Sequence, residues 1–216
     1  VNDFVDPGAG SGFYHAFLLQ FNRPGITTGM GNATLSKNTN NTASWRIDYT
    51  LSTQSTLTRE GALLLAPDGA ISVNDITTQR SYVGFGESHG DWIVWMELDT
   101  SQSRVYRMDI LIRKGKDLSD VSLAGRFNLN GFYETTTGDS VDTTFGRIEF
   151  NGRGLYGDYT LRNSFGQLAS TGEATYDYET TADGRVAFIG GLDPVGFFSR
   201  NAQRRLLVFP DVNPAG

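Results

Sequence analysis

The chain has 216 residues, of which 38% are hydrophobic, and it contains no cysteine, which excludes disulfides, thiolate zinc sites and cysteine nucleophiles. Its 18 lysines and arginines against 24 aspartates and glutamates give a formal net charge of −6. No nucleic-acid partner is expected, because phosphate binding needs a basic surface, and the lack of any run of 18 apolar residues predicts no membrane-spanning helix.

The composition favours strands joined by tight turns. The chain has 26 glycines and 14 phenylalanines, 9 tyrosines and 3 tryptophans, so aromatic side chains supply much of the expected core. About 15 short strands and no convincing helix are expected, which is typical of meandering barrels and sandwiches.

The first expected strand covers residues 13–21. Its alternation places Phe13, His15, Phe17 and Leu19 on one apolar face and Tyr14 with its alternate neighbours on the other. A Gly-rich strand is expected at 28–35, followed by a polar loop at 37–42. The next strand covers residues 45–51, on which Tyr49 points inward and Asp48 lies outward or at a polar edge. Asp48 and the later Asp158 are candidates for capping or bridging neighbouring strands.

The remaining strands of the first half are expected at 61–66, 70–73, 82–85, 92–98 and 106–112. A turn at 67–70 separates the first two, because Gly69 permits a positive φ. On the last strand the alternation assigns Arg107, Asp109 and Arg113 to a solvated face.

The tetrapeptide Asp-Tyr-Thr-Leu occurs at 48–51 and again at 158–161. Asp-Gly pairs follow at 68–69 and 183–184, and Val-Gly-Phe follows at 83–85 and 195–197. Matches in the same order predict an internal duplication. The predicted domains are residues 1–117 and 118–216, joined near 114–119.

The predicted fold is therefore all-β, with two tandem, related antiparallel meander halves that form small β-barrels of calycin-like architecture. The likeness to lipocalin-type calyces concerns architecture alone, since their sequence motifs are absent. One continuous barrel or sandwich built from both halves is the alternative, because closing the sheets removes exposed edges in either case.

The sequence at 86–90, Gly-Glu-Ser-His-Gly, fits the nucleophile-elbow pattern with Ser88 at its centre. That elbow requires a helix after the serine, whereas a strand is expected at 92–98, so a hairpin loop is the preferred interpretation. No catalytic residue, metal site or cofactor is predicted, and the balance favours a protein that is not an enzyme.

His15 lies among aromatic side chains and is either a core residue with a satisfied hydrogen bond or a polar group in an aromatic pocket. The sequence predicts a non-enzymatic, exported (periplasmic, cell-surface or secreted) barrel that binds a small apolar or amphipathic ligand in its interior. The alternatives are a structural or surface-interaction protein with filled barrels, and a glycan or ester hydrolase. The predicted ligand-contacting residues are His15, Phe17, Trp45, Tyr49, Trp92, Tyr106, Tyr159 and Tyr176.

Overall fold

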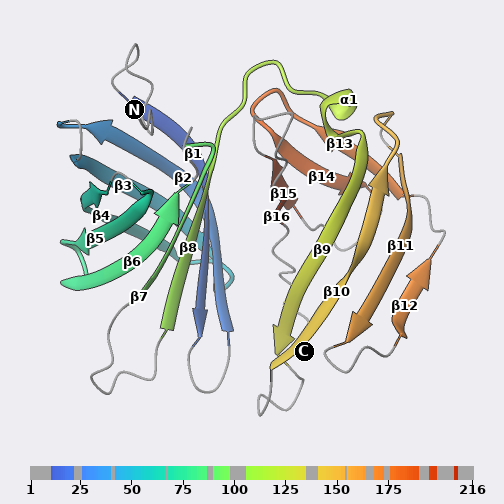
Figure 1. The fold of residues 1–216 in the computed structure, drawn as a ribbon, viewed down its shortest axis with the longest axis horizontal. Helices are drawn as coiled ribbons and strands as arrows, with labels where there is room; N and C mark the ends of the chain where they lie inside the picture. The colour runs from blue at the N-terminus through green and yellow to red at the C-terminus, as the bar shows by residue number, and fades with distance from the viewer. Residues whose placement is uncertain are drawn as a thin grey trace. The chain divides into compact units, whose positions relative to one another are not determined.

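The structure is a computed structural model, and the chain divides into two compact units, Val1–Lys114 and Gly115–Gly216 (Figure 1). The residues that the structure describes are 11–21, 26–39, 42–66, 68–86, 90–97, 106–134, 141–153, 155–163, 168–172, 176–189, 195–198 and 207–208.

The first unit is a closed barrel of eight antiparallel strands in which each strand pairs with the next along the chain. The barrel closes where β1 pairs with β8, with Phe17 opposite Ile110. The expectation of an all-β fold with a meander barrel is confirmed for this unit. The strands are β1 (Ser11–Phe21), β2 (Ile26–Lys37), β3 (Thr42–Leu51), β4 (Thr56–Leu65), β5 (Ala70–Asp75), β6 (Arg80–Gly86), β7 (Trp92–Glu97) and β8 (Tyr106–Arg113).

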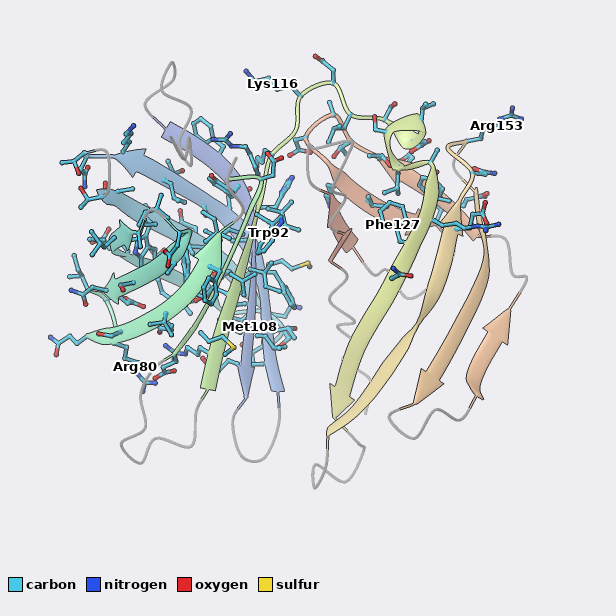
Figure 2. All side chains as sticks on the ribbon, viewed as in Figure 1. Arg80, Trp92, Met108, Lys116, Phe127 and Arg153 are labelled. Atoms are coloured by element: carbon cyan, nitrogen blue, oxygen red, sulfur yellow. The ribbon has the colours of Figure 1, made fainter. Side chains whose placement is uncertain are left out.

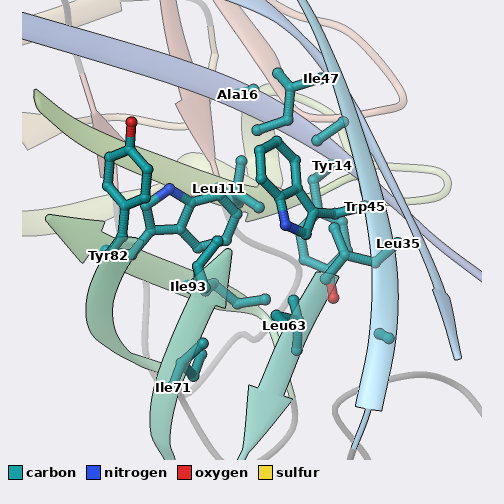
Figure 3. Packing of buried hydrophobic residues seen from close by; sticks show 14 of the residues in the cluster. Tyr14, Ala16, Leu35, Trp45, Ile47, Leu63, Ile71, Tyr82, Ile93 and Leu111 are labelled. Atoms are coloured by element: carbon teal, nitrogen blue, oxygen red, sulfur yellow. The ribbon is translucent and has the colours of Figure 1, made fainter. Parts of the chain in front are cut away.

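Alternation along each strand separates an inner face from an outer one. On β3, Ala43, Trp45, Ile47 and Tyr49 are buried while the residues between them are more exposed. These four belong to a single core cluster that receives side chains from all eight strands, and Figure 3 shows many of them converging. An eight-stranded barrel has an interior just wide enough to be filled in this way.

The outer face of β3 is polar, as expected from the tetrapeptide at 48–51. Asp48 accepts hydrogen bonds from the Thr58 hydroxyl at 2.6 Å and from Arg46 at 3.1 Å, and thereby links β3 to β4. The bond from Thr58, followed by that from Arg46, lowers the pKa of Asp48. The predicted bridging role of Asp48 is confirmed.

The predicted faces of β1 and β8 were wrong. Tyr14, Ala16 and Leu18 belong to the interior cluster, so His15 and Phe17 lie on the opposite face. Likewise, Asp109 is fully buried on the inner face of β8. The reason is that both faces of these strands are apolar or buried, since His15, Phe17 and Ile112 are themselves buried, and period-two alternation then cannot tell inside from outside.

The second unit begins with α1 (Asp120–Leu123), a single short helix that the sequence did not predict, and continues as an antiparallel sheet. In its described residues the pairing runs β16-β15-β14-β13-β11-β10-β9, with β12 paired to β11. The sheet is not shown to close, so a second barrel, the tandem relationship and the calycin likeness remain predictions. The strands are β9 (Gly125–Glu134), β10 (Val141–Phe150), β11 (Leu155–Asn163), β12 (Leu168–Gly172), β13 (Tyr176–Thr180), β14 (Arg185–Ile189), β15 (Val195–Phe198) and β16 (Leu207–Val208).

A small aromatic group fixes α1 to this sheet. Phe150 packs edge-on against both Phe127 and Tyr178, with ring centroids 5.5 and 5.2 Å apart. The Tyr178 hydroxyl accepts from the Gly152 N–H at 3.1 Å, and the Asp120 carboxylate accepts from the Thr180 N–H at 2.8 Å.

Within the described residues, no helix has the length and apolar character needed to cross a membrane.

Candidate functional site

An arginine lies between two carboxylates inside the barrel. Arg59 on β4, Asp75 at the end of β5 and Asp109 on β8 all have side chains with no solvent exposure. Arg59 Nε donates to Asp75 at 2.7 Å, and its Nη1 donates to both oxygens of Asp109 at 2.9 Å. Charged groups are seldom fully buried unless they are paired in this way.

Asp109 also accepts bonds from two aromatic side chains. The Tyr49 hydroxyl donates to Oδ1 at 2.6 Å, and the Trp95 indole N–H donates to Oδ2 at 2.6 Å. Trp95 can reach this carboxylate because it lies directly opposite Asp109 in the ladder between β7 and β8. Two of the three tryptophans, Trp45 and Trp95, pack together nearby with ring centroids 5.6 Å apart.

These contacts fix the charge states of the cluster. Burial is the largest single effect on the pKa of Arg59 and acts to lower it. The charge of Asp109, with smaller contributions from Tyr82, Tyr49 and Asp75, acts in the opposite direction. Together these charges outweigh burial, so the pKa of Arg59 lies above its ordinary value. Burial, reinforced by the charge of Asp109, raises the pKa of Tyr49 well above its usual range. Arg59 is therefore charged and Tyr49 neutral at physiological pH.

A row of polar side chains continues from this cluster along the inner face of β6, β7, β8 and β1. Tyr82 lies opposite Glu97, and Arg107 lies opposite Gln20. Glu97 and Arg107 each lie one residue beyond the pair formed by Met96 and Met108, so the row is continuous. Arg107 Nε donates to the Gln20 side-chain oxygen at 2.5 Å.

Arg80, the first residue of β6, forms an ion pair with Glu97 Oε1 and is labelled in Figure 2. The Glu97 side chain is 1% exposed and the Arg80 side chain 26%, so the pair extends from the interior to the rim. Thr78 belongs to the turn after β5, where its N–H donates to Asp75 at 3.0 Å. We call this set of side chains the polar end of the barrel: Gln20, Tyr49, Arg59, Asp75, Thr78, Arg80, Tyr82, Glu97, Arg107 and Asp109.

Several atoms of the polar end are shielded from solvent yet have no hydrogen-bond partner among the described residues. Buried polar atoms in folded proteins nearly always have partners, and an unpaired atom calls for an explanation such as a bound water, ion or ligand. The atoms are Arg59 Nη2, Thr78 Oγ1, Tyr82 Oη, Glu97 Oε2 and Arg107 Nη1.

The Tyr82 hydroxyl lies at the centre of this arrangement. Weak side-chain hydrogen bonds with Thr78 and Arg107 act to lower its pKa, but neither contact has the geometry of a well-formed hydrogen bond. Burial dominates and raises the pKa of Tyr82, so the hydroxyl keeps its proton. The Arg59 guanidinium lies 4.9 Å from the centre of the Tyr82 ring. The polar end thus offers several donors and one carboxylate oxygen that lack a well-formed hydrogen bond among the described residues.

Of the five predicted ligand-contacting residues whose side chains the structure describes, two lie in the barrel interior. Trp45 and Tyr49 are both core residues, and Tyr49 contacts the polar end. His15, Phe17 and Trp92 lie on alternate positions to the interior residues of β1 and β7 and therefore do not line it. Three more are placed only by their strands: Tyr106 in β8, Tyr159 in β11 and Tyr176 in β13.

The nucleophile-elbow pattern is not described in full, because Ser88 and His89 lie outside the described residues. The expected strand that follows it is present as β7, which starts at Trp92. Among the described residues, no group of three or more histidine, aspartate or glutamate side chains is arranged to hold a metal ion.

Tyr49 is the one member of the polar end that the sequence predicted as a site residue; in its buried ion-pair cluster, sequence reasoning missed Arg59 and Asp75 and assigned Asp109 to a solvated face. The position of each residue on its strand could have indicated that it is buried. Arg59 lies on the same, apolar face of β4 as Leu57, Gly61 and Leu63. Asp75 lies on the same face of β5 as the buried Val73. A charged residue on the apolar face of a strand is rarely buried without a partner.

Comparison of the chain with protein-family models, curated proteins and solved structures finds no match.

Proposed function

We propose that this chain is a non-enzymatic binding protein whose barrel takes up a small amphipathic molecule at its polar end. The observation that supports this most is the convergence there of buried, unpaired donors and an unpaired carboxylate oxygen. A buried polar atom without a hydrogen-bond partner costs about 1–3 kcal/mol, so a ligand that supplies partners gains a matching contribution.

The closed barrel and its aromatic core limit where the ligand binds. The middle of the interior is filled by Trp45, Trp95 and their neighbours, so the proposed position is the polar end and not the whole barrel. The unpaired atoms are shielded from solvent, and a ligand therefore reaches them when the partly exposed Arg80 and Arg107 side chains move aside. Polar groups that fix a ligand beside an apolar wall are the usual composition of a small-molecule site.

The test is a titration of the full chain with four six-carbon amphipaths: hexan-1-ol, hexanoate, hexylamine and 2-aminohexanoate. Trp95 donates to Asp109 within the polar end, so intrinsic tryptophan fluorescence should report binding, and calorimetry gives the affinity. At least one compound should bind with one-to-one stoichiometry. Binding should be unchanged in Arg46→Gln, because Arg46 lies on the outer face of β3. If none of the four binds, the proposed function is wrong.

A second candidate function, surface interaction by a filled barrel, is favoured by one specific observation. Val83 and Met96 lie opposite each other on the outer face of β6 and β7, and Phe85 lies two residues from Val83. All three are exposed, at 42%, 54% and 65% respectively. Adjacent exposed apolar side chains often mark interaction sites. Concentration-dependent self-association or partner capture that is lost in Phe85→Ser would support this candidate.

Export remains a proposal, which fractionation of expressing cells into cytoplasmic, periplasmic and medium fractions would test. The alternative of a glycan or ester hydrolase also remains a proposal, and Ser88 is the residue at which its esterase form can be tested. Loss of any measured esterase activity in Ser88→Ala would be needed to support it.

A further inference from the structure

The unpaired atoms at the polar end are of two opposite kinds. Four of them can donate hydrogen bonds: Arg59 Nη2, Thr78 Oγ1, Tyr82 Oη and Arg107 Nη1. The fifth, Glu97 Oε2, can only accept a hydrogen bond when the carboxylate is ionised. Tyr82, Glu97 and Arg107 occupy neighbouring positions on three consecutive strands. A ligand that completes all of them must present acceptor oxygens and a donor close to each other.

The formal charges of the polar end select between ligand classes. Arg59 pairs with Asp75 and Asp109, and Arg80 pairs with Glu97. The remaining cation, Arg107, is bonded to the neutral amide of Gln20 and has no carboxylate partner within the described part of the chain. Three arginines and three carboxylates balance, so a ligand with a net charge would leave an uncompensated charge in a low-dielectric interior.

We propose that the polar end binds the zwitterionic head of an α-amino acid. Its carboxylate accepts from Arg107, Tyr82 and Thr78, and its ammonium group donates to Glu97 Oε2. This inference rests on the proposed function and specifies its ligand class. Arginine suits a carboxylate because its guanidinium forms charge-assisted bonds of fixed geometry, and an amino acid as a whole is neutral and preserves the charge balance.

The discriminating experiment compares 2-aminohexanoate with hexanoate, hexylamine and hexan-1-ol on the unmodified full chain by calorimetry. The amino acid is expected to bind at least about tenfold more tightly than any of the other three, because it alone forms charge-assisted hydrogen bonds with both the donors and Glu97 Oε2. If hexanoate, hexylamine or hexan-1-ol binds as tightly, the zwitterion inference is overturned while the proposed binding function stands. If no probe binds, both fail.

Two variants assign the two halves of the head group. Arg107→Gln should reduce the affinity for 2-aminohexanoate to that for hexylamine, and Glu97→Gln should reduce it to that for hexanoate. Glu60→Gln is the matched control, because Glu60 lies on the exposed face of β4 and should bind like the parent. Parent-like affinity in both Arg107→Gln and Glu97→Gln would overturn the assignment. Should either fail to fold by circular dichroism, the four-probe comparison on the unmodified chain still decides.

Discussion

Arg59 Nη1 donates to both carboxylate oxygens of Asp109 at 2.9 Å, and neither side chain is exposed to solvent. The bond crosses the barrel interior, since Arg59 lies on β4 and Asp109 on β8. A buried ion pair of this kind adds little to the free energy of unfolding relative to apolar residues of the same size. Removing one member, however, leaves the other charge buried without a partner and is strongly destabilising.

Arg59→Met should therefore lower the free energy of unfolding by about 3–5 kcal/mol, because Asp75 and Asp109 both lose their cation. Urea unfolding followed by circular dichroism measures the change. Arg46→Met is the control: Arg46 pairs with Asp48 on the outer face, with both side chains more than half exposed, and should cost about 0–1 kcal/mol. Equal effects of the two substitutions would contradict the structural role given to the buried pair.

The two buried tryptophans should differ in what their indole N–H groups contribute. Trp95 Nε1 donates to Asp109 at 2.6 Å, whereas Trp45 Nε1 has no partner among the described residues. Both side chains are buried and pack against each other, so replacement by phenylalanine removes similar apolar area at each. Trp95→Phe should be about 1–3 kcal/mol more destabilising than Trp45→Phe in urea unfolding. The reverse order would show that packing, and not the bond to Asp109, decides.

The barrel should lose stability at alkaline pH through its buried tyrosines. Burial raises the pKa of Tyr49, Tyr82 and Tyr14, and the charge of Asp109 raises that of Tyr49 further. Below about pH 10 both the folded and the unfolded chain hold these protons; above it only the unfolded chain releases them. Stability is therefore fully present below about pH 10 and declines above it, by at most about 1.4 kcal/mol per pH unit for each tyrosine until the folded-state pKa of that tyrosine is reached.

Urea midpoints measured between pH 8 and pH 11 test this expectation. Tyr49→Phe should be less stable than the parent at pH 8, because the hydroxyl donates to Asp109, but its stability should fall less steeply above pH 10. A parent-like alkaline slope in this variant would mean that Tyr49 is not among the residues responsible.

Local patterns in the sequence predicted much of the barrel. Alternation located the strands of the first unit, and the Asp-Gly pair at 68–69 predicted a turn in which Gly69 has a positive φ of 90°. The candidate site was predicted far less well. Arg59, Asp75 and Asp109 come together only because the closed barrel brings β4, β5 and β8 around one interior, a long-range relationship that no window of sequence contains.

The outer face of the barrel explains the other failures. His15, Phe17 and Ile112 are buried although they lie on the face opposite the core cluster. On β1 and β8 the outer face is apolar, whereas the inner face is mixed and on β8 carries both Asp109 and Leu111. The outer face therefore shows the clearer hydrophobic periodicity in the sequence. Sequence reasoning assumed that the more apolar face of a strand points into the barrel. That assumption fails on β1 and β8, where residues on the outer face are buried as well.

Gly31 on β2 should tolerate no side chain. A β-carbon placed there would lie 1.8 Å from the Asp48 carbonyl oxygen and 2.9 Å from the Tyr49 Cα, both backbone atoms of the neighbouring strand β3. Gly31→Ala must therefore push β2 and β3 apart next to Tyr49, whose hydroxyl donates to Asp109. The substitution should lower the free energy of unfolding by about 1–3 kcal/mol or more. Asn32→Ala, one residue along and exposed, should change stability by no more than about 0.5 kcal/mol. Thermal and urea unfolding of both variants decide the matter, and a Gly31→Ala protein as stable as Asn32→Ala would show that the two strands are not packed as closely as described.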